Sequence, residues 1–165
     1  MALADLVAEF RRLRDLGRRA LDQASGSWVN QVIANDHNSI AANVRHLNGV
    51  LRDRLGEFLI SDGENPWRNR EEEFARHVTT RQEVLRLWDE GWAVAEATLS
   101  KLREADLDLP VRFRGQAQPA GRTLLQVLTH VAYHVGQIVV LVRIQPDLAW
   151  RPVTNQQSAS AFAVR

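Results

Sequence analysis

The sequence of 165 residues contains no cysteine and a single lysine, and its 21 basic and 20 acidic side chains leave a formal net charge of only +1. The absence of cysteine excludes disulfide frameworks, thiolate zinc sites, iron–sulfur clusters and cysteine nucleophiles, so any metal site must consist of His, Asp or Glu. The balanced charge argues against a protein that binds nucleic acid through its phosphates, because such proteins usually carry a basic excess.

The chain also lacks long apolar runs and the common catalytic motifs. No stretch approaches the 18 or more uninterrupted apolar residues that indicate a membrane-spanning helix. Asp5 and Glu9 interrupt the apolar pattern near the start, which is not the pattern of a secretory signal. GxSxG, P-loop and GxGxxG motifs are absent. We therefore expect a soluble, cytoplasmic, single-domain protein that contacts neither a membrane nor nucleic acid.

Helical periodicity recurs in four segments, which predicts an all-α fold. Apolar residues recur there at spacings of three and four, over about 3–24, 39–60, 79–104 and 120–145. The fourth segment is apolar nearly all round, which is typical of a helix at the centre of a bundle. We predict a four-helix bundle over residues 1–145, with a long polar connection at 61–78 between the second and third helices, and an extended C-terminal tail over 146–165.

Two shorter features lie outside these helices. Within residues 110–118, Val111 and Phe113 alternate with Arg112 and Arg114, which permits a short β-ribbon or an extended strand. Together with the connection at 61–78, this segment is in a position to shape a substrate pocket. In the tail, Trp150 is the expected anchor to the core.

The fourth predicted helix contains the run THVAYHVGQ, in which His130 and His134 are four residues apart. That spacing places both side chains on one face of the helix, so that both imidazoles can reach one metal ion at about 2.0–2.1 Å. Gln126 and Gln137 share this face, and buried polar groups need partners. Five histidines give this spacing by chance roughly one time in eight, so a pair of structural core histidines is an alternative interpretation.

His46 lies on the second predicted helix, away from its apolar stripe. Beside it Gly49 and Gly56 are seven residues apart, which suggests that another backbone comes close there, since glycine inside a helix costs about 1 kcal/mol relative to alanine. The alternative is that both glycines are tolerated at an exposed edge. If the second and fourth helices pack together, His46, His130 and His134 can form a site with open coordination positions, the pattern of a catalytic metal.

The remaining candidates fit less well. Asp53 lies two turns along from His46 and could supply a further ligand or support one, but an ordinary surface carboxylate is the favoured interpretation. His37 precedes the second helix and His77 lies in the charged connection, and both are interpreted as loop residues rather than ligands.

Several motifs resemble the DinB-like (YfiT-like) superfamily of metalloenzymes, and more narrowly a bacterial branch known as a domain of unknown function. The resemblance covers about residues 3–145. Its most specific parts are the pair HL on the second helix, the connection DGE-x-PWRNR-x-x-EF, and the run H-x-x-x-H-x-x-Q-I on the fourth helix.

This resemblance implies a four-helix bundle, often dimeric, with a divalent metal ion. In many members zinc or nickel is held by one histidine of the second helix and two of the fourth, which here are His46, His130 and His134. Better-known members transfer low-molecular-weight thiols such as mycothiol or bacillithiol, and others are isomerases or amide-forming enzymes.

The expected function is therefore that of a divalent-metal-dependent enzyme acting on a small molecule, and the resemblance implies that the protein is a homodimer. Because the chain has no cysteine, a thiol that it transfers to an electrophile must be a diffusible cofactor. The alternatives are a metal-dependent hydrolase, a non-catalytic metal-binding bundle related to stress, and a dimerisation scaffold with an accidental metal.

Overall fold

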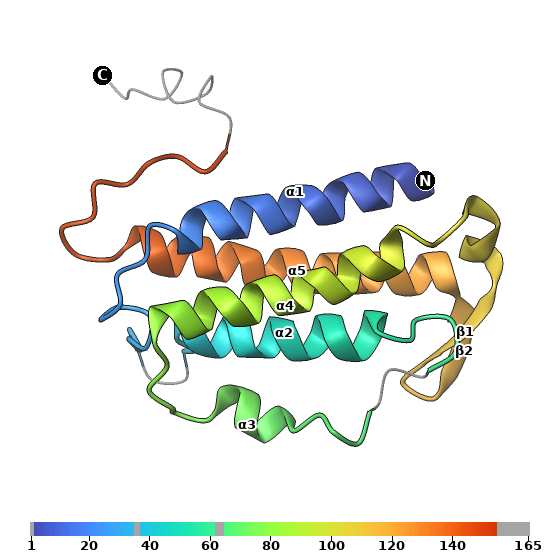
Figure 1. Ribbon diagram of the computed structural model, residues 1–165, viewed down its shortest axis with the longest axis horizontal. Coiled ribbons are helices and arrows are strands. Elements are labelled where there is room, and N and C mark those ends of the chain that lie inside the picture. Colours follow the sequence, from blue (N-terminus) through green and yellow to red (C-terminus); the bar gives the residue numbers. More distant parts are fainter. Residues whose placement is uncertain (1, 35–36, 62–64, 155–165) are drawn as a thin grey trace.

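The computed structural model describes residues 2–34, 37–61 and 65–154. They are mostly helical with one small sheet (Figure 1). The elements in chain order are α1 (Leu3–Leu21), α2 (Ile40–Leu55), α3 (Arg70–Phe74), α4 (Arg81–Leu99), the 3-10 helix η1 (Glu104–Asp108), β1 (Pro110–Phe113), β2 (Gln116–Pro119) and α5 (Ala120–Arg143).

The longer helices α1, α2, α4 and α5 run alongside one another (Figure 1). α2 packs mainly on α4 and α1 mainly on α5, while contacts of α2 with α5 and of α1 with α4 join the two pairs. Between them lies one apolar core, in which the largest fully buried side chains include Phe10, Leu47, Leu51, Leu124 and Ile138. The helical character predicted from periodicity is confirmed, and the packing of α2 on α5 positions the candidate site.

Side-chain caps fix where several helices begin. Ser39 accepts a hydrogen bond from the amide of Ala42, and Thr80 accepts one from the amide of Glu83. The predicted ends of the second and third helices are wrong by about five residues, because α2 ends at Leu55 and α4 at Leu99. The apolar spacing continues into the turns that follow these helices, so periodicity alone extends them too far.

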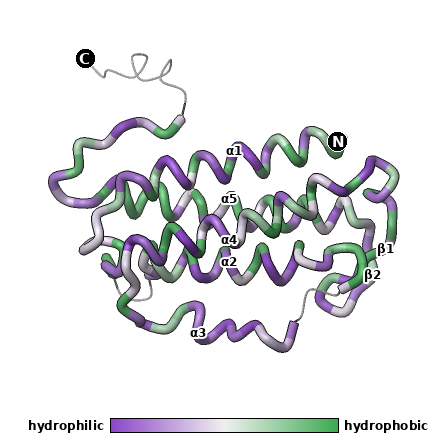
Figure 2. Tube along the Cα trace, viewed as in Figure 1, coloured by the Kyte–Doolittle hydropathy of each residue, from purple (hydrophilic) through white to green (hydrophobic). Residues whose placement is uncertain are grey.

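The connection between α2 and α4 contains the helix α3, which the sequence prediction missed. α3 runs beside α2 (Figure 1) and is largely hydrophilic (Figure 2). The Asn69 side chain caps its first turn, and Glu73 is its buried residue. α3 has five residues, too few for a periodic pattern to be detected. Its packing on α2 brings Glu73 towards the interior.

The β-ribbon that the sequence permitted is present, so the expectation of an all-α fold needs correction. β1 and β2 are antiparallel, with Phe113 paired to Gln116 across a two-residue turn. Both turn residues, Arg114 and Gly115, have positive φ angles, of 51° and 76°. Two positive φ angles are the pattern of a type I′ hairpin turn, whose twist matches that of the strands.

Helix α5 is long and apolar enough, by length and composition, to cross a membrane, although core helices of soluble proteins pass the same test. Because it packs against α1, α2, η1 and the ribbon, we interpret α5 as a core helix. In the tail that follows, Trp150 packs against the core and Val153 is more deeply buried. The rest of the predicted tail, residues 155–165, lies outside the described residues.

The close approach of another backbone predicted at Gly49 and Gly56 is wrong. Gly56 is exposed, and the backbone atom nearest to a Cβ there is the carbonyl oxygen of Arg52, one turn earlier in the chain. A Cβ atom on Gly49 would lie 2.0 Å from Oε1 of Glu73, so this glycine makes room for a side chain. The close backbone approach instead involves Gly91 of α4, where a Cβ would lie 3.0 Å from Cα of Asn48 on α2.

Candidate metal centre

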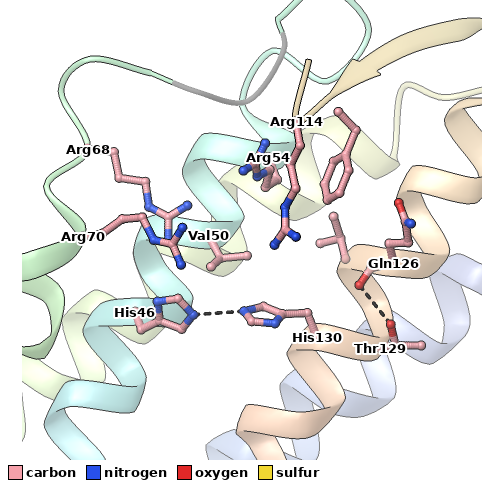
Figure 3. A pocket seen from close by; sticks show the side chains of 11 residues that line it. His46, Val50, Arg54, Arg68, Arg70, Arg114, Gln126, Thr129 and His130 are labelled. Carbon is pink, nitrogen blue, oxygen red and sulfur yellow. Dashed lines mark hydrogen bonds between the residues drawn. The ribbon is translucent and has the colours of Figure 1, made fainter. Parts of the chain in front are cut away.

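The packing of α2 on α5 brings together His46, His130 and His134. One ring nitrogen of each lies within 4.8 Å of the other two. Nε2 of His46 is 2.9 Å from Nε2 of His130 (Figure 3). His46 and His134 are buried, and His130 is the most exposed of the three. The three side chains that the sequence singled out as ligands therefore form one cluster.

These separations can be compared with those that a metal ion requires. Two nitrogens bound at about 2.0–2.1 Å are about 2.9 Å apart at a 90° angle, about 3.3 Å apart at the tetrahedral angle, and at most about 4.2 Å apart. The His46–His130 pair already has such a separation. A small rotation of one ring brings two ring nitrogens that are 4.8 Å apart within the maximum separation of about 4.2 Å. The cluster therefore fits a single ion.

The buried carboxylate of Glu73 fixes the orientation of His46. Its Oε2 atom lies 2.8 Å from Nδ1 of His46. Burial alone would raise the pKa of Glu73, but the hydrogen bonds from His46 and Arg68 hold it below its ordinary value. An ionised carboxylate only accepts hydrogen bonds, so Nδ1 of His46 is the donor and Nε2 presents its lone pair. Carboxylate–histidine pairs of this kind orient metal ligands.

Amide oxygens orient His134 in the same way. Nδ1 of His134 lies 2.9 Å from Oδ1 of Asn43 and 2.9 Å from Oε1 of Gln137. Donation from Nδ1 to these oxygens leaves the lone pair on Nε2, where a metal ion can bind. The prediction that Gln137 shares the histidine face is confirmed, and the structure adds that it orients His134.

The electrostatic surroundings keep the two α5 histidines neutral. Burial lowers the pKa of His130 to about 4, and the neighbouring side chains of His46, Arg68 and Arg114 lower it further. Burial also lowers the pKa of His134 to about 4. Neutral imidazole is the form that binds metals, so at pH 7 these nitrogens need not lose a proton first.

The donor set itself points to a cation. When Nδ1 of His46 donates to Glu73, the neutral form of the ring carries no proton on Nε2. This lone pair faces Nε2 of His130 at 2.9 Å. A cation between the rings satisfies both nitrogens and the one on His134, whereas a proton can satisfy only one pair. The chemistry of the residues therefore fits a metal ion.

Asp53 has a different role from the surface position favoured by the sequence. It is only 2% exposed and accepts hydrogen bonds from Nη1 of Arg68 at 2.9 Å and from the amide of Asn65 at 3.0 Å. Arg68 in turn donates to both carboxylate oxygens of Glu73 at 2.7 and 3.0 Å. Asp53 thus anchors the arginine that holds Glu73 against His46, and the favoured interpretation was wrong.

Sequence reasoning missed Arg68 and Glu73 as supporting residues. Both lie in the connection motif PWRNR-x-x-EF, which was used for the resemblance but assigned no role. The remaining histidines lie apart from the cluster. His77 is exposed, and its Nε2 atom lies 2.6 Å from Oε1 of Glu72. His37 lines a separate cavity with Asn38.

An open cavity of about 380 Å³ lies beside the cluster (Figure 3). His46 and His130 form part of its wall, so free coordination positions on a bound ion would face it. The cavity is strongly basic on the side formed by α2, α3 and the β-ribbon. Its other lining residues are Val50, Arg54, Arg68, Arg70, Phe113, Arg114, Gln126, Val127 and Thr129.

Comparison with known proteins identifies a family without giving an activity. No curated protein matches the chain. A family described as "Protein of unknown function (DUF1572)" matches residues 2–158, which include the helices, the α2–α4 connection, the β-ribbon and all three clustered histidines. The match spans nearly the whole chain, and the protein belongs to the DUF1572 family.

Proposed function

We propose that this protein is a divalent-metal-dependent enzyme of the DinB-like superfamily, with the four-helix bundle of that group, and that it acts on a small molecule. The observation that carries the proposal is the convergence of the ring nitrogens of His46, His130 and His134 beside a cavity of about 380 Å³, which His46 and His130 line. Three protein ligands with open positions are typical of catalytic rather than structural metal sites. The cavity volume lies in the range of small-molecule sites.

The reaction we favour is transfer of a low-molecular-weight thiol to an electrophilic small molecule. A divalent ion, zinc or nickel by resemblance to the superfamily, supplies Lewis acidity that lowers the pKa of a thiol. Because the chain has no cysteine, the thiol must diffuse in. The sulfur forms a bond to the electrophilic carbon, the leaving group departs with its electron pair, and the thiol proton passes to solvent.

The residues of the chain have defined tasks in this proposal. His46, His130 and His134 hold the ion, while Glu73 and Gln137 fix the two buried rings through Nδ1. Arginines beside the cavity favour the anionic form of sulfur, because neighbouring positive charge lowers a thiol pKa. The homodimer and the cytoplasmic location expected from the sequence stay predictions.

Metal stoichiometry tests the site. Purified protein loaded with Zn²⁺ or Ni²⁺ and then desalted should hold about one ion per chain by elemental analysis. Single substitutions His46→Ala, His130→Ala and His134→Ala should each abolish stoichiometric binding. His77→Ala is the matched control, because this histidine is exposed and outside the cluster. Equal metal content in all variants would refute the site.

Turnover tests the reaction. Metal-loaded and metal-stripped protein should be assayed with several thiols against a generic electrophile, and in parallel with simple esters and amides. Metal-dependent loss of thiol supports transfer. Metal-dependent hydrolysis without thiol would replace transfer with the hydrolase alternative, and a stoichiometric metal with no turnover on any substrate would favour the non-catalytic binding protein.

A further inference from the structure

We propose that the cavity beside the three histidines is an oxyanion site, which selects small molecules bearing a carboxylate or phosphate group through Arg114 and Arg70. This inference rests on the proposed function for its metal-bound partner, but the anion site itself consists of residues outside the metal cluster. Four arginines, Arg54, Arg68, Arg70 and Arg114, line a cavity of small-molecule size.

The four arginines differ in the charge that they leave available. Arg68 is bound to the buried carboxylates of Asp53 and Glu73, so its charge is already balanced. Arg54 lies 3.7 Å from Asp53 and stacks over the ring of Phe113.

Arg70 and Arg114 are the arginines available to a ligand. Within the described part of the chain, neither guanidinium has a hydrogen bond or an ion pair, and both side chains are exposed at the cavity. Arg114 also lies over the ring of Phe113, 5.4 Å from its centroid, a contact that leaves its N–H donors free for a ligand. Arg114 reaches from the ribbon towards the histidines, and Arg70 lies above His46 (Figure 3). A bound divalent ion would add further positive charge, because its neutral imidazole ligands do not offset the charge of the ion.

The backbone at Arg114 is a second, independent observation. Arg114 is the first residue of the two-residue turn between β1 and β2 and has a φ of 51°. Asparagine or glycine is favoured at this position of a type I′ turn, because a larger side chain is strained at positive φ. An arginine there is unfavourable for the hairpin, and residues in strained conformations often serve a ligand site. The stability of the hairpin therefore does not explain an arginine at this position, whereas a ligand in the cavity would.

The chemistry of arginine indicates the ligand class. The planar guanidinium donates two parallel hydrogen bonds to a carboxylate or a phosphate, which a lysine cannot reproduce. With an oxyanion held by Arg114 and Arg70, the other end of a small molecule lies against His46 and His130, where the reacting group would meet the metal.

Calorimetric titration tests this inference, with inorganic phosphate and succinate as probes and uncharged succinamide as the control ligand. Both anions should bind the metal-stripped and the metal-loaded protein, and succinamide should bind neither. Binding to the metal-stripped form distinguishes the anion site from the metal site, so either can fail without the other. Absence of anion binding to both forms would overturn the inference.

The decisive variant is Arg114→Asn, which removes the guanidinium but supplies a residue that the turn favours. We expect an unchanged or higher melting temperature together with anion affinity at least about 10-fold weaker, as for loss of a charged hydrogen bond. Arg70→Gln should weaken binding similarly. Arg112→Gln, on the same ribbon but not lining the cavity, is the control of equal charge change. Equal anion affinity in the Arg112 and Arg114 variants would overturn the assignment.

Discussion

Replacing Gly49 with alanine should weaken metal binding without unfolding the protein. The added Cβ would lie 2.0 Å from Oε1 and 2.8 Å from Cδ of Glu73. Ordinary contact requires about 3.4 Å or more, so the carboxylate must retreat by more than about 1 Å. Its hydrogen bond to Nδ1 of His46 is now 2.8 Å long and would be lost.

The expected magnitude follows from the role of Glu73. Loss of a group that orients a metal ligand typically lowers metal affinity by about 10–100-fold. Folding should survive because the atoms that clash belong to the end of a flexible side chain, and alanine favours the helix by about 1 kcal/mol over glycine. The Gly49→Ala variant should therefore fold normally and bind Zn²⁺ about 10–100-fold more weakly.

Competition with a chromophoric chelator measures this affinity, with circular dichroism as the check on folding. Gly136→Ala is the matched control, because this glycine lies on α5 two residues from His134 and a Cβ there meets nothing within 4 Å. Glu73→Gln should show a loss like that of Gly49→Ala. If both the Gly49 and the Glu73 variants bind Zn²⁺ as tightly as the wild type, Glu73 does not support the site.

Three further predictions concern stability. In metal-free protein, the two α5 histidines have pKa values of about 4 when folded, against about 6.5 when unfolded, so the unfolded chain binds more protons between these values. The free energy of unfolding should fall as pH drops from 6.5 to 4, by about 1–2 kcal/mol for each histidine after allowance for solvent screening. Chemical denaturation measures this free energy at each pH, and a constant value across the range would refute the pKa values. Gly17→Ala places a Cβ 2.3 Å from the Trp88 ring and should destabilise by about 1–3 kcal/mol in urea, whereas an unchanged midpoint would contradict the tight packing. Asp53→Ala removes one of the two buried carboxylates bound to Arg68 and leaves the other, Glu73, so it should lower the free energy of unfolding by about 1.5–3 kcal/mol. A loss under about 0.5 kcal/mol in urea denaturation would show that solvent replaces Asp53.

The sequence predicted the parts of the site that depend on local periodicity. His130 and His134 share a helix face because they are four residues apart, and the apolar stripes located the helices on which they and His46 lie. Periodicity does not determine the packing of α2 on α5, which brings His46 to the pair. The structure supplies it through a shared core.

The supporting residues could not be predicted because they depend on how the α2–α4 connection folds back. Asp53 looks like a surface carboxylate on its own helix, and only Arg68 from the connection gives it a buried partner. The pattern around Gly49 predicted the close approach of another backbone, but the Glu73 side chain fills that space. A sequence pattern does not show which of the two is present. The basic cavity likewise combines α3 and the ribbon, which are far apart in the chain.

Anomalous diffraction from crystals of Zn²⁺- or Ni²⁺-loaded protein tests the central claim most directly. We predict one strong peak per chain, bonded to His46, His130 and His134 at about 2.0–2.1 Å, with its open side towards the arginine-lined cavity. A loaded crystal without a peak among these histidines, or with its peak on other side chains, would contradict the claim.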